Sequence, residues 1–78
     1  MTLTRQKISV ETGGTDEEGC LVFEDGRLLA VLVRLSSQHD ASLTGKWFLE
    51  HGFGPLDTPE HPIFDDLSAA EGWITSQR

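Results

Sequence analysis

The amino-acid sequence predicts an α+β domain, a four-stranded antiparallel β-meander with one C-terminal α-helix packed on one face. Three observations support this prediction. Residues 27–34 contain the longest apolar run, with apolar side chains at both even and odd positions. The turn dipeptide Asp25-Gly26 precedes this run, and residues 67–77 carry apolar side chains at helical spacing. A strand with one face in water alternates apolar and polar residues, so both faces of the apolar run are expected to be covered.

Length and composition fit a single small domain over residues 1–78. The hydrophobic content is 37%, with two tryptophans and four phenylalanines, which is enough apolar side chain for a core. A domain of this size buries only about 60–65% of the surface of its unfolded chain. Small domains therefore often add disulfides, metal ions or self-association to their core. Because Cys20 is the single cysteine, a disulfide within one chain is excluded.

The charge of the chain is acidic, with a formal net charge of −7. Nucleic acids and anionic membrane surfaces attract lysine and arginine, so the sequence predicts neither of them as a partner. The apolar run is too short for the roughly 20 residues that span a bilayer. The lone cysteine and the absence of an apolar segment after the first residues predict a cytoplasmic location.

The first half of the chain is expected to form strands joined by short loops. Residues 1–5 are expected to be frayed, and residues 6–12 alternate apolar and polar side chains as a half-exposed strand does. The glycine-rich and acidic segment 13–19 predicts a loop, and residues 20–23 a second strand. Asp25-Gly26 predicts a two-residue type I′ hairpin, because both central residues of that turn need a positive φ.

The hairpin predicts a register for the two strands that it joins. With Asp25-Gly26 as the loop, Glu24 is expected to face Arg27 as a charge pair at the rim of the sheet. Going away from the turn, the expected pairs are Phe23 with Leu28, Val22 with Leu29, Leu21 with Ala30 and Cys20 with Val31. Directly opposed residues share a face of the sheet. One face is then expected to carry Cys20, Val22, Leu29, Val31, Val33 and Leu35, and the other to carry Leu21, Phe23, Leu28, Ala30 and Leu32.

The second half of the chain is expected to hold one more strand and a loop. Residues 36–42 form a polar connection, and a strand begins near Thr44 and runs to His51, where glycines end it. Residues 56–62 include two prolines and predict a loop. Ile63 and Phe64 are expected to anchor that loop on the core.

A helix is predicted over about residues 66–77. Asp65 or Asp66 could cap its N-terminus, and Ser68 with Glu71 fits a capping box as an alternative. Gly72 costs about 1 kcal/mol relative to alanine inside a helix, so a close neighbour is expected there. The apolar stripe consists of Leu67, Ala70 and Ile74, with Trp73 beside it.

A single helix of this length covers one face of the sheet only, since eleven residues span about 16 Å. Monomers rarely expose several hundred Å² of contiguous apolar surface. A second copy of the chain is the expected cover, because two-fold dimers are the commonest oligomers. The alternative is that residues 56–64 and 1–5 fold over this face. The candidate dimer face consists of Leu21, Phe23, Leu28, Ala30, Leu32 and Phe48.

The potential metal ligands are far apart in the sequence. Cys20, His39, His51 and His61 are separated by 19, 12 and 10 residues, whereas zinc ligands usually come in close pairs. No metal is therefore predicted, although His51 and His61 would be the pair to test. The acidic segment 16–18 lacks the spacing of a calcium-binding loop.

Catalytic motifs are also absent from the sequence. Ser36, Ser37, His39 and Asp40 include the residue types of a hydrolytic triad, but no G-x-S-x-G elbow is present. The segment 51–55, His-Gly-Phe-Gly-Pro, has the glycines of a phosphate loop without a helix directly after it. The sequence therefore predicts no enzyme and no cofactor.

The leading prediction is a small acidic, non-catalytic protein that self-associates or binds another protein. One alternative is a small-ligand or metal binder, or a minor enzyme. Its candidate ligand corner consists of Trp47, His51, Phe53 and His61. The other alternative is an acidic inhibitor, in which carboxylates imitate nucleic acid for a basic partner.

Overall fold

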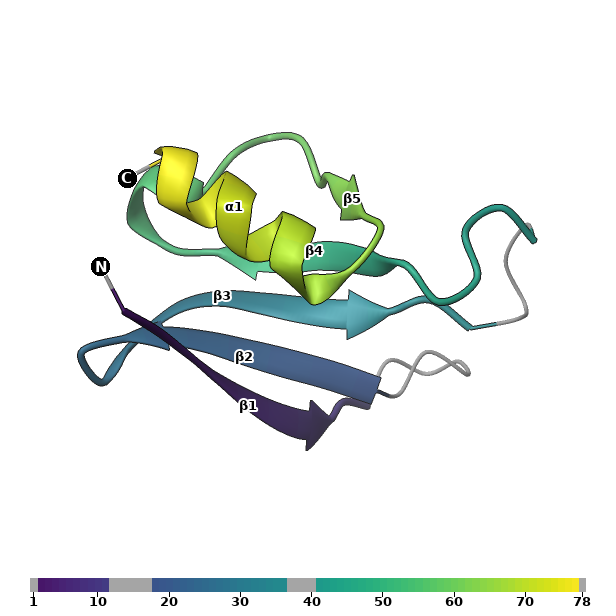
Figure 1. The fold of residues 1–78 in the computed structure, drawn as a ribbon, viewed down its shortest axis with the longest axis horizontal. Helices are drawn as coiled ribbons and strands as arrows, with labels where there is room; N and C mark the ends of the chain where they lie inside the picture. The colour runs from purple at the N-terminus through teal and green to yellow at the C-terminus, as the bar shows by residue number, and fades with distance from the viewer. Residues whose placement is uncertain (1, 12–17, 37–40, 78) are drawn as a thin grey trace.

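The computed structural model of the chain describes residues 2–11, 18–36 and 41–77. It confirms the α+β class, with an antiparallel meander and one C-terminal helix (Figure 1). The strands follow the sheet order β1-β2-β3-β4-β5, and the fifth, very short strand lies where the sequence predicted only an anchored loop. The elements are β1 (Leu3–Ser9), β2 (Glu18–Glu24), β3 (Arg27–Arg34), β4 (Trp47–Gly52), the short 3₁₀ turn η1 (Gly54–Leu56), β5 (Ile63–Phe64) and α1 (Leu67–Gln77).

The first strand starts earlier than predicted. β1 begins at Leu3 and ends at Ser9, so the expectation of a frayed segment 1–5 was wrong for its last three residues. Leu3 packs against the core, and Arg5 forms an ion pair with Glu71 of α1 at 3.1 Å. These contacts with distant parts of the chain hold the start of β1 in place, and they could not be inferred from the residues next to it.

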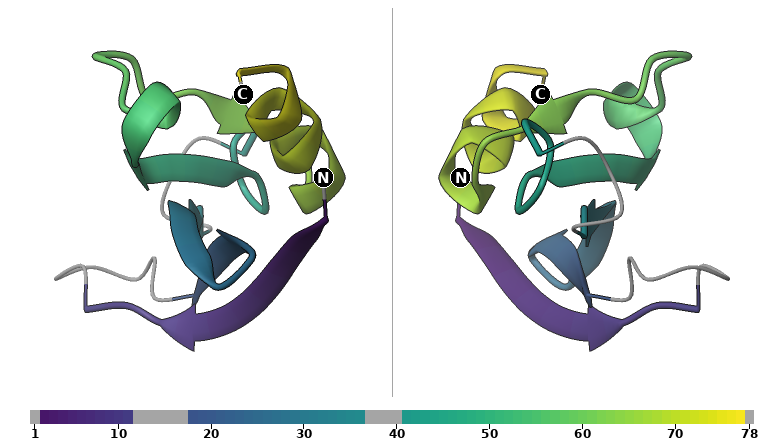
Figure 2. Two further views of the ribbon diagram at one scale, coloured as in Figure 1. Left: turned by 90° about the vertical axis from the view of Figure 1, so that its left-hand side faces the viewer. Right: turned by 90° about the vertical axis from the view of Figure 1, so that its right-hand side faces the viewer.

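The sheet curls around α1, so that both its first and its last strand reach the helix (Figure 2). The concave face holds the core, in which Ala70 and Ile74 of α1 are fully buried. Leu67 and Trp73 pack against the same core, and the Trp73 ring lies 5.6 Å from that of Phe64. The predicted apolar stripe of the helix is confirmed. The opposite, convex face of the sheet faces away from α1.

The hairpin between β2 and β3 has the predicted turn but not the predicted register. Asp25 and Gly26 have φ values of 53° and 79°, as a type I′ turn requires. Glu24 and Phe23 also pair as predicted, with Arg27 and Leu28 respectively. Beyond them β3 contains an extra residue, Leu29, in a β-bulge, so that the remaining pairs are Val22 with Ala30, Leu21 with Val31, Cys20 with Leu32 and Gly19 with Val33.

This bulge exchanges the faces of β3. Ala30 and Leu32 lie with Cys20 and Val22 in the concave core, and all four side chains are 0% exposed. The predicted assignment of Ala30 and Leu32 to an uncovered face was therefore wrong. Leu29 also packs into the core, whereas Val31 is moved to the convex face beside Leu21.

A second bulge lies in β4, where Glu50 is the extra residue. Leu49 pairs with Leu32 and is buried in the core, as is Trp47. Because of the bulge, His51 pairs with Val31 and comes to the convex face. Both bulges thus change which side chains share a face.

The N-terminus of α1 is capped by Asp66. Its Oδ1 accepts a hydrogen bond from the Ala69 amide at 2.7 Å, which satisfies one of the free amides of the first turn. Asp65 instead forms an ion pair with Lys46 at 3.0 Å. Of the alternatives left open by the sequence, the structure therefore selects Asp66 as the cap.

Gly72 lies on the exposed side of α1, and the expectation of a close neighbour was wrong. A Cβ atom built at this residue would meet no atom within 4 Å. Gly72→Ala is therefore expected to raise the free energy of unfolding by about 1 kcal/mol, because alanine loses less backbone entropy in a helix. Thermal denaturation followed by circular dichroism would show this as a midpoint about 4–8 °C higher. An unchanged or lower midpoint would contradict it.

Candidate functional site

The convex face is the largest surface of the sheet that α1 does not cover. The strand register places side chains of all five strands on it, since cross-strand partners share a face. The exposed Glu50, the extra residue of the β4 bulge, is unpaired in the ladder next to His51. The cross-strand paired residues of this face are Thr4, Gln6, Ile8, Leu21, Phe23, Leu28, Val31, Val33, Phe48, His51 and Ile63. None of these described strand positions carries an aspartate, glutamate, lysine or arginine, although 24% of the chain is charged.

Exposure on the convex face is graded from its centre to its margin. Val33 is 3% exposed, beneath its neighbours, and Ile63 at the sheet edge is 42% exposed. Leu21, Phe23, Val31 and Phe48 are half-buried. The face is therefore an apolar surface in partial contact with water in a single chain.

The predicted dimer face and the convex face overlap in part. Leu21, Phe23 and Phe48 lie on the convex face, and Leu28 pairs with Phe23 near the hairpin turn. Ala30 and Leu32 lie in the core instead, as described above. Seven members of the convex face were not in the predicted set: Thr4, Gln6, Ile8, Val31, Val33, His51 and Ile63. The three in β1 were not assigned to this face, the two bulges changed the register of Val31, Val33 and His51, and Ile63 lies in the unexpected fifth strand.

The alternative cover for this face is not supplied by the described residues of segments 1–5 and 56–64. Leu3 and Leu56 pack into the concave core. Residues 63–64 pair with β4 at the edge of the sheet and extend it. These segments therefore enlarge the sheet or fill the concave side, and the convex side keeps its apolar surface.

The predicted ligand corner is divided by the sheet. Trp47 is 7% exposed in the concave core, whereas His51 lies on the convex face. The His51 ring meets Phe53 edge to face, with centroids 4.4 Å apart. The structure therefore brings together His51 and Phe53 but separates Trp47 from them.

The side chain of His61 bonds to the backbone of β4 and so keeps His61 at the edge of that strand. Its Nδ1 lies 2.8 Å from the Leu49 carbonyl oxygen, which can only accept, so this nitrogen carries the proton and donates. The ring also stacks on Phe48, with centroids 5.5 Å apart. The Leu49 amide donates to the Pro62 carbonyl at 3.0 Å. His61 thus completes the pairing of β4 and belongs to its edge.

The potential metal ligands and nucleophiles do not converge. Among the described residues, no group of three or more His, Cys, Asp or Glu side chains could hold a metal ion. His39, with Ser37, Asp40 and the acidic residues 16–17, lies outside the described residues. Cys20 is fully buried, and this burial raises the pKa of its thiol, an effect that nearby Arg5 opposes. The Cys20 thiol is therefore a neutral part of the core.

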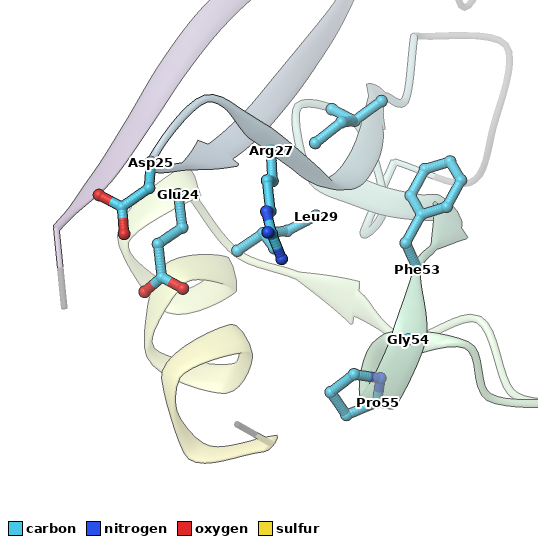
Figure 3. A pocket seen from close by; sticks show the side chains of 8 residues that line it. Glu24, Asp25, Arg27, Leu29, Phe53, Gly54 and Pro55 are labelled. Atoms are coloured by element: carbon cyan, nitrogen blue, oxygen red, sulfur yellow. The ribbon is translucent and has the colours of Figure 1, made fainter.

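A second surface feature is a half-open hollow at one end of the sheet, with a volume of about 500 Å³ (Figure 3). The β2–β3 hairpin forms one wall, and the junction between β4 and η1 forms the other. The lining residues are Glu24, Asp25, Arg27, Leu28, Leu29, Phe53, Gly54 and Pro55. Phe53, one of the predicted corner residues, is thus shared between the His51 contact and this hollow.

Comparisons with known proteins give no relative of this chain. Neither the models of protein families, nor the curated proteins, nor the solved structures contain a match. Within the described part of the chain, no helix has the length and apolar character needed to cross a membrane. Any function proposed for the chain therefore follows from its own residues, and above all from the convex face and the hollow.

Proposed function

We propose that this protein is a non-catalytic interaction module that self-associates through the convex face of its sheet. The observation that carries the proposal is an apolar, half-buried sheet face whose cross-strand pairs contain no charged side chain, in a chain with a net charge of −7. Self-association would remove this surface from water, and each Å² of apolar area that it buries would stabilise the dimer by about 25 cal/mol. A buried lone cysteine also fits a reducing compartment such as the cytoplasm.

The charge distribution favours a second copy as the partner. Two chains of net charge −7 repel each other, and the repulsion is strongest where carboxylates would meet in a desolvated interface. The cross-strand pairs of the convex face avoid such contacts, because none of them contains an aspartate or a glutamate. Two copies could therefore meet there about a two-fold axis without burying an unpaired charge.

The edges of the sheet are poorer candidates for self-association. If two β1 strands paired antiparallel about Gln6, Arg5 of one copy would lie opposite Lys7 of the other. Like charges directly opposite each other destabilise a strand pair. At the other edge, β5 has only two residues and follows Pro62, which has no amide to donate. Association is therefore expected to use the face and not the edges.

The test is the mass of the particle in solution, measured by light scattering. The wild-type chain is expected to have twice the mass of one chain at high micromolar concentration. Val31→Glu and Leu21→Lys each put a charge into the middle of the convex face and are expected to give monomers. The two substitutions change the net charge in opposite directions, so a shared effect cannot come from net charge.

The matched control is Ser68→Glu, which adds the same charge as Val31→Glu at an exposed position of α1. This variant is expected to remain dimeric. Circular dichroism would establish that each variant is folded. The proposal fails if the wild type is monomeric at high micromolar concentration, or if folded Val31→Glu and Leu21→Lys keep the dimer mass.

A further inference from the structure

We propose that the hollow between the β2–β3 hairpin and η1 binds a monocarboxylate with an apolar body, and that Arg27 binds the carboxylate. This site lies at the turn end of the sheet, where Leu28 belongs both to the hollow and to the margin of the convex face, and the proposal does not rest on self-association. Its chemistry could be supplied by a free small acid or by the C-terminal residue of a peptide. The argument rests on the fixed walls of the hollow, on the position of Arg27 and on the apolar lining.

The walls of the hollow are fixed by backbone contacts. The Phe53 amide donates to the Leu29 carbonyl at 2.9 Å and ties the two walls together. Beyond Phe53, η1 is closed by the bond from the Asp57 amide to the Gly54 carbonyl at 3.0 Å, and Leu56 is fully buried beneath it. A preformed site loses little entropy when it binds a ligand.

Arg27 is positioned to receive an anion. Figure 3 shows its side chain extending into the hollow, between Glu24 on one side and Phe53 and Pro55 on the other. Among the described residues, Arg5, Arg34 and Lys46 each form an ion pair with a carboxylate, and Arg27 has no such pair with another described residue. A planar guanidinium that faces a hollow can donate two parallel hydrogen bonds to the two oxygens of a carboxylate.

The rest of the lining suits an apolar group next to that carboxylate. Apolar surface comes from Leu28, Leu29, Phe53 and Pro55, and Phe53 is 43% exposed. The Phe53 ring also contacts the His51 ring, with an interplanar angle of 70°. The volume of about 500 Å³ is within the range of small-molecule sites, roughly 300–1,000 Å³.

The charge of the lining favours a ligand with one negative charge over a ligand with two. Arg27 lines the hollow together with the carboxylates of Glu24 and Asp25. A phosphate, with its higher negative charge, would be repelled by these carboxylates at short range. A carboxylate gains the same guanidinium contact with less repulsion, and its apolar body gains the contacts with Phe53 and Pro55.

The experiment is a ¹⁵N–¹H chemical-shift titration of the full chain with 3-phenylpropionate. Saturable shifts are expected at the amides of Leu28, Leu29, Phe53 and Gly54, with an affinity in the millimolar range for a ligand this small. The uncharged isostere 3-phenylpropionamide is expected to bind at least about tenfold more weakly, because it lacks the charged contact with Arg27. Inorganic phosphate is expected to give no saturable shift at these amides.

Two variants separate the role of Arg27 from general electrostatics. Arg27→Gln is expected to weaken 3-phenylpropionate binding by about tenfold, whereas Arg34→Gln, with the same charge change at the other end of β3, should not alter it. A peptide ending in phenylalanine, with a free or an amidated C-terminus, identifies the source of the ligand. The proposal is overturned if neither the acid nor the free peptide shifts these amides, or if Arg34→Gln weakens binding as much as Arg27→Gln. Because the readout is local, it holds for a monomer and for a dimer.

Discussion

Gly52→Ala is expected to lower the free energy of unfolding by about 3 kcal/mol or more, because a side chain at this position has no space. A Cβ atom on Gly52 would overlap the Leu56 carbonyl oxygen and lie 2.7 Å from its carbon and 2.8 Å from the Leu56 Cβ. The obstacle is the backbone of η1, which cannot move aside as the end of a flexible side chain can. Leu56 is fully buried, and the Leu56 amide donates to the Phe53 carbonyl at 3.2 Å, so η1 is held against β4.

Urea denaturation followed by circular dichroism would measure this effect. A chain of this length has a free energy of unfolding of about 4–12 kcal/mol, so the substitution would remove a large part of the stability of the domain. Gly54→Ala is the matched control, since Gly54 has a φ of 60° but no atom within 4 Å of a built Cβ. That variant is expected to lose only about 1–2 kcal/mol, from the left-handed conformation alone. Equal midpoints for the two variants would contradict the steric explanation.

The features of the fold that depend on neighbouring residues were predictable from the sequence. Asp25-Gly26 forms the type I′ turn that this dipeptide predicts, because few other residues adopt a positive φ at low cost. The helix ends where predicted, and Ala70 and Ile74 lie in the core as their spacing indicates. In each case the physical cause lies within a few residues of the element itself.

The register of β3 was not predictable, because the bulge leaves no trace in the pattern of polarity. Residues 28–33 are all apolar, so a shift by one residue exchanges one apolar set for another. A polar residue in this run would have shown which face is the core. The bulge brings Leu29 into one core cluster with Leu56 of η1 and with Ala70 and Ile74 of α1, and the local sequence does not describe these distant contacts.

The candidate site was predictable to a similar extent. The uncovered apolar face was inferred from the presence of one short helix, and Leu21, Phe23 and Phe48 belong to it. Trp47 and His51 were assigned to one corner, but the bulge at Glu50 places them on opposite faces. The hollow could not be inferred, since Arg27 and Phe53 meet only after β4 has folded beside β3.

Leu32→Glu is expected to unfold the domain at neutral pH, whereas Val31→Glu is expected to leave it folded. The two residues are adjacent in β3 but lie on opposite faces of the sheet. Leu32 is fully buried in the concave core among Cys20, Leu49 and other apolar side chains. A carboxylate there would have no water and no partner, which costs several kcal/mol and approaches the whole stability of the chain. At the half-buried Val31, the carboxylate can reach water, and a loss of about 1–2 kcal/mol is expected.

The pH dependence of Leu32→Glu provides an independent check of this explanation. Burial raises the pKa of the introduced carboxyl in the folded state above its value of about 4.3 in the unfolded chain. The folded state then binds more protons, so the stability of the variant falls as the pH rises from the unfolded value through the folded one. Circular dichroism without urea is therefore expected to show Leu32→Glu folded to a larger extent near pH 4 than at pH 7, measured against the wild type at each pH. If Val31→Glu were unfolded at pH 7 and Leu32→Glu folded, the bulge at Leu29 would be wrong, because without it Val31 would face the core and Leu32 would lie on the convex face.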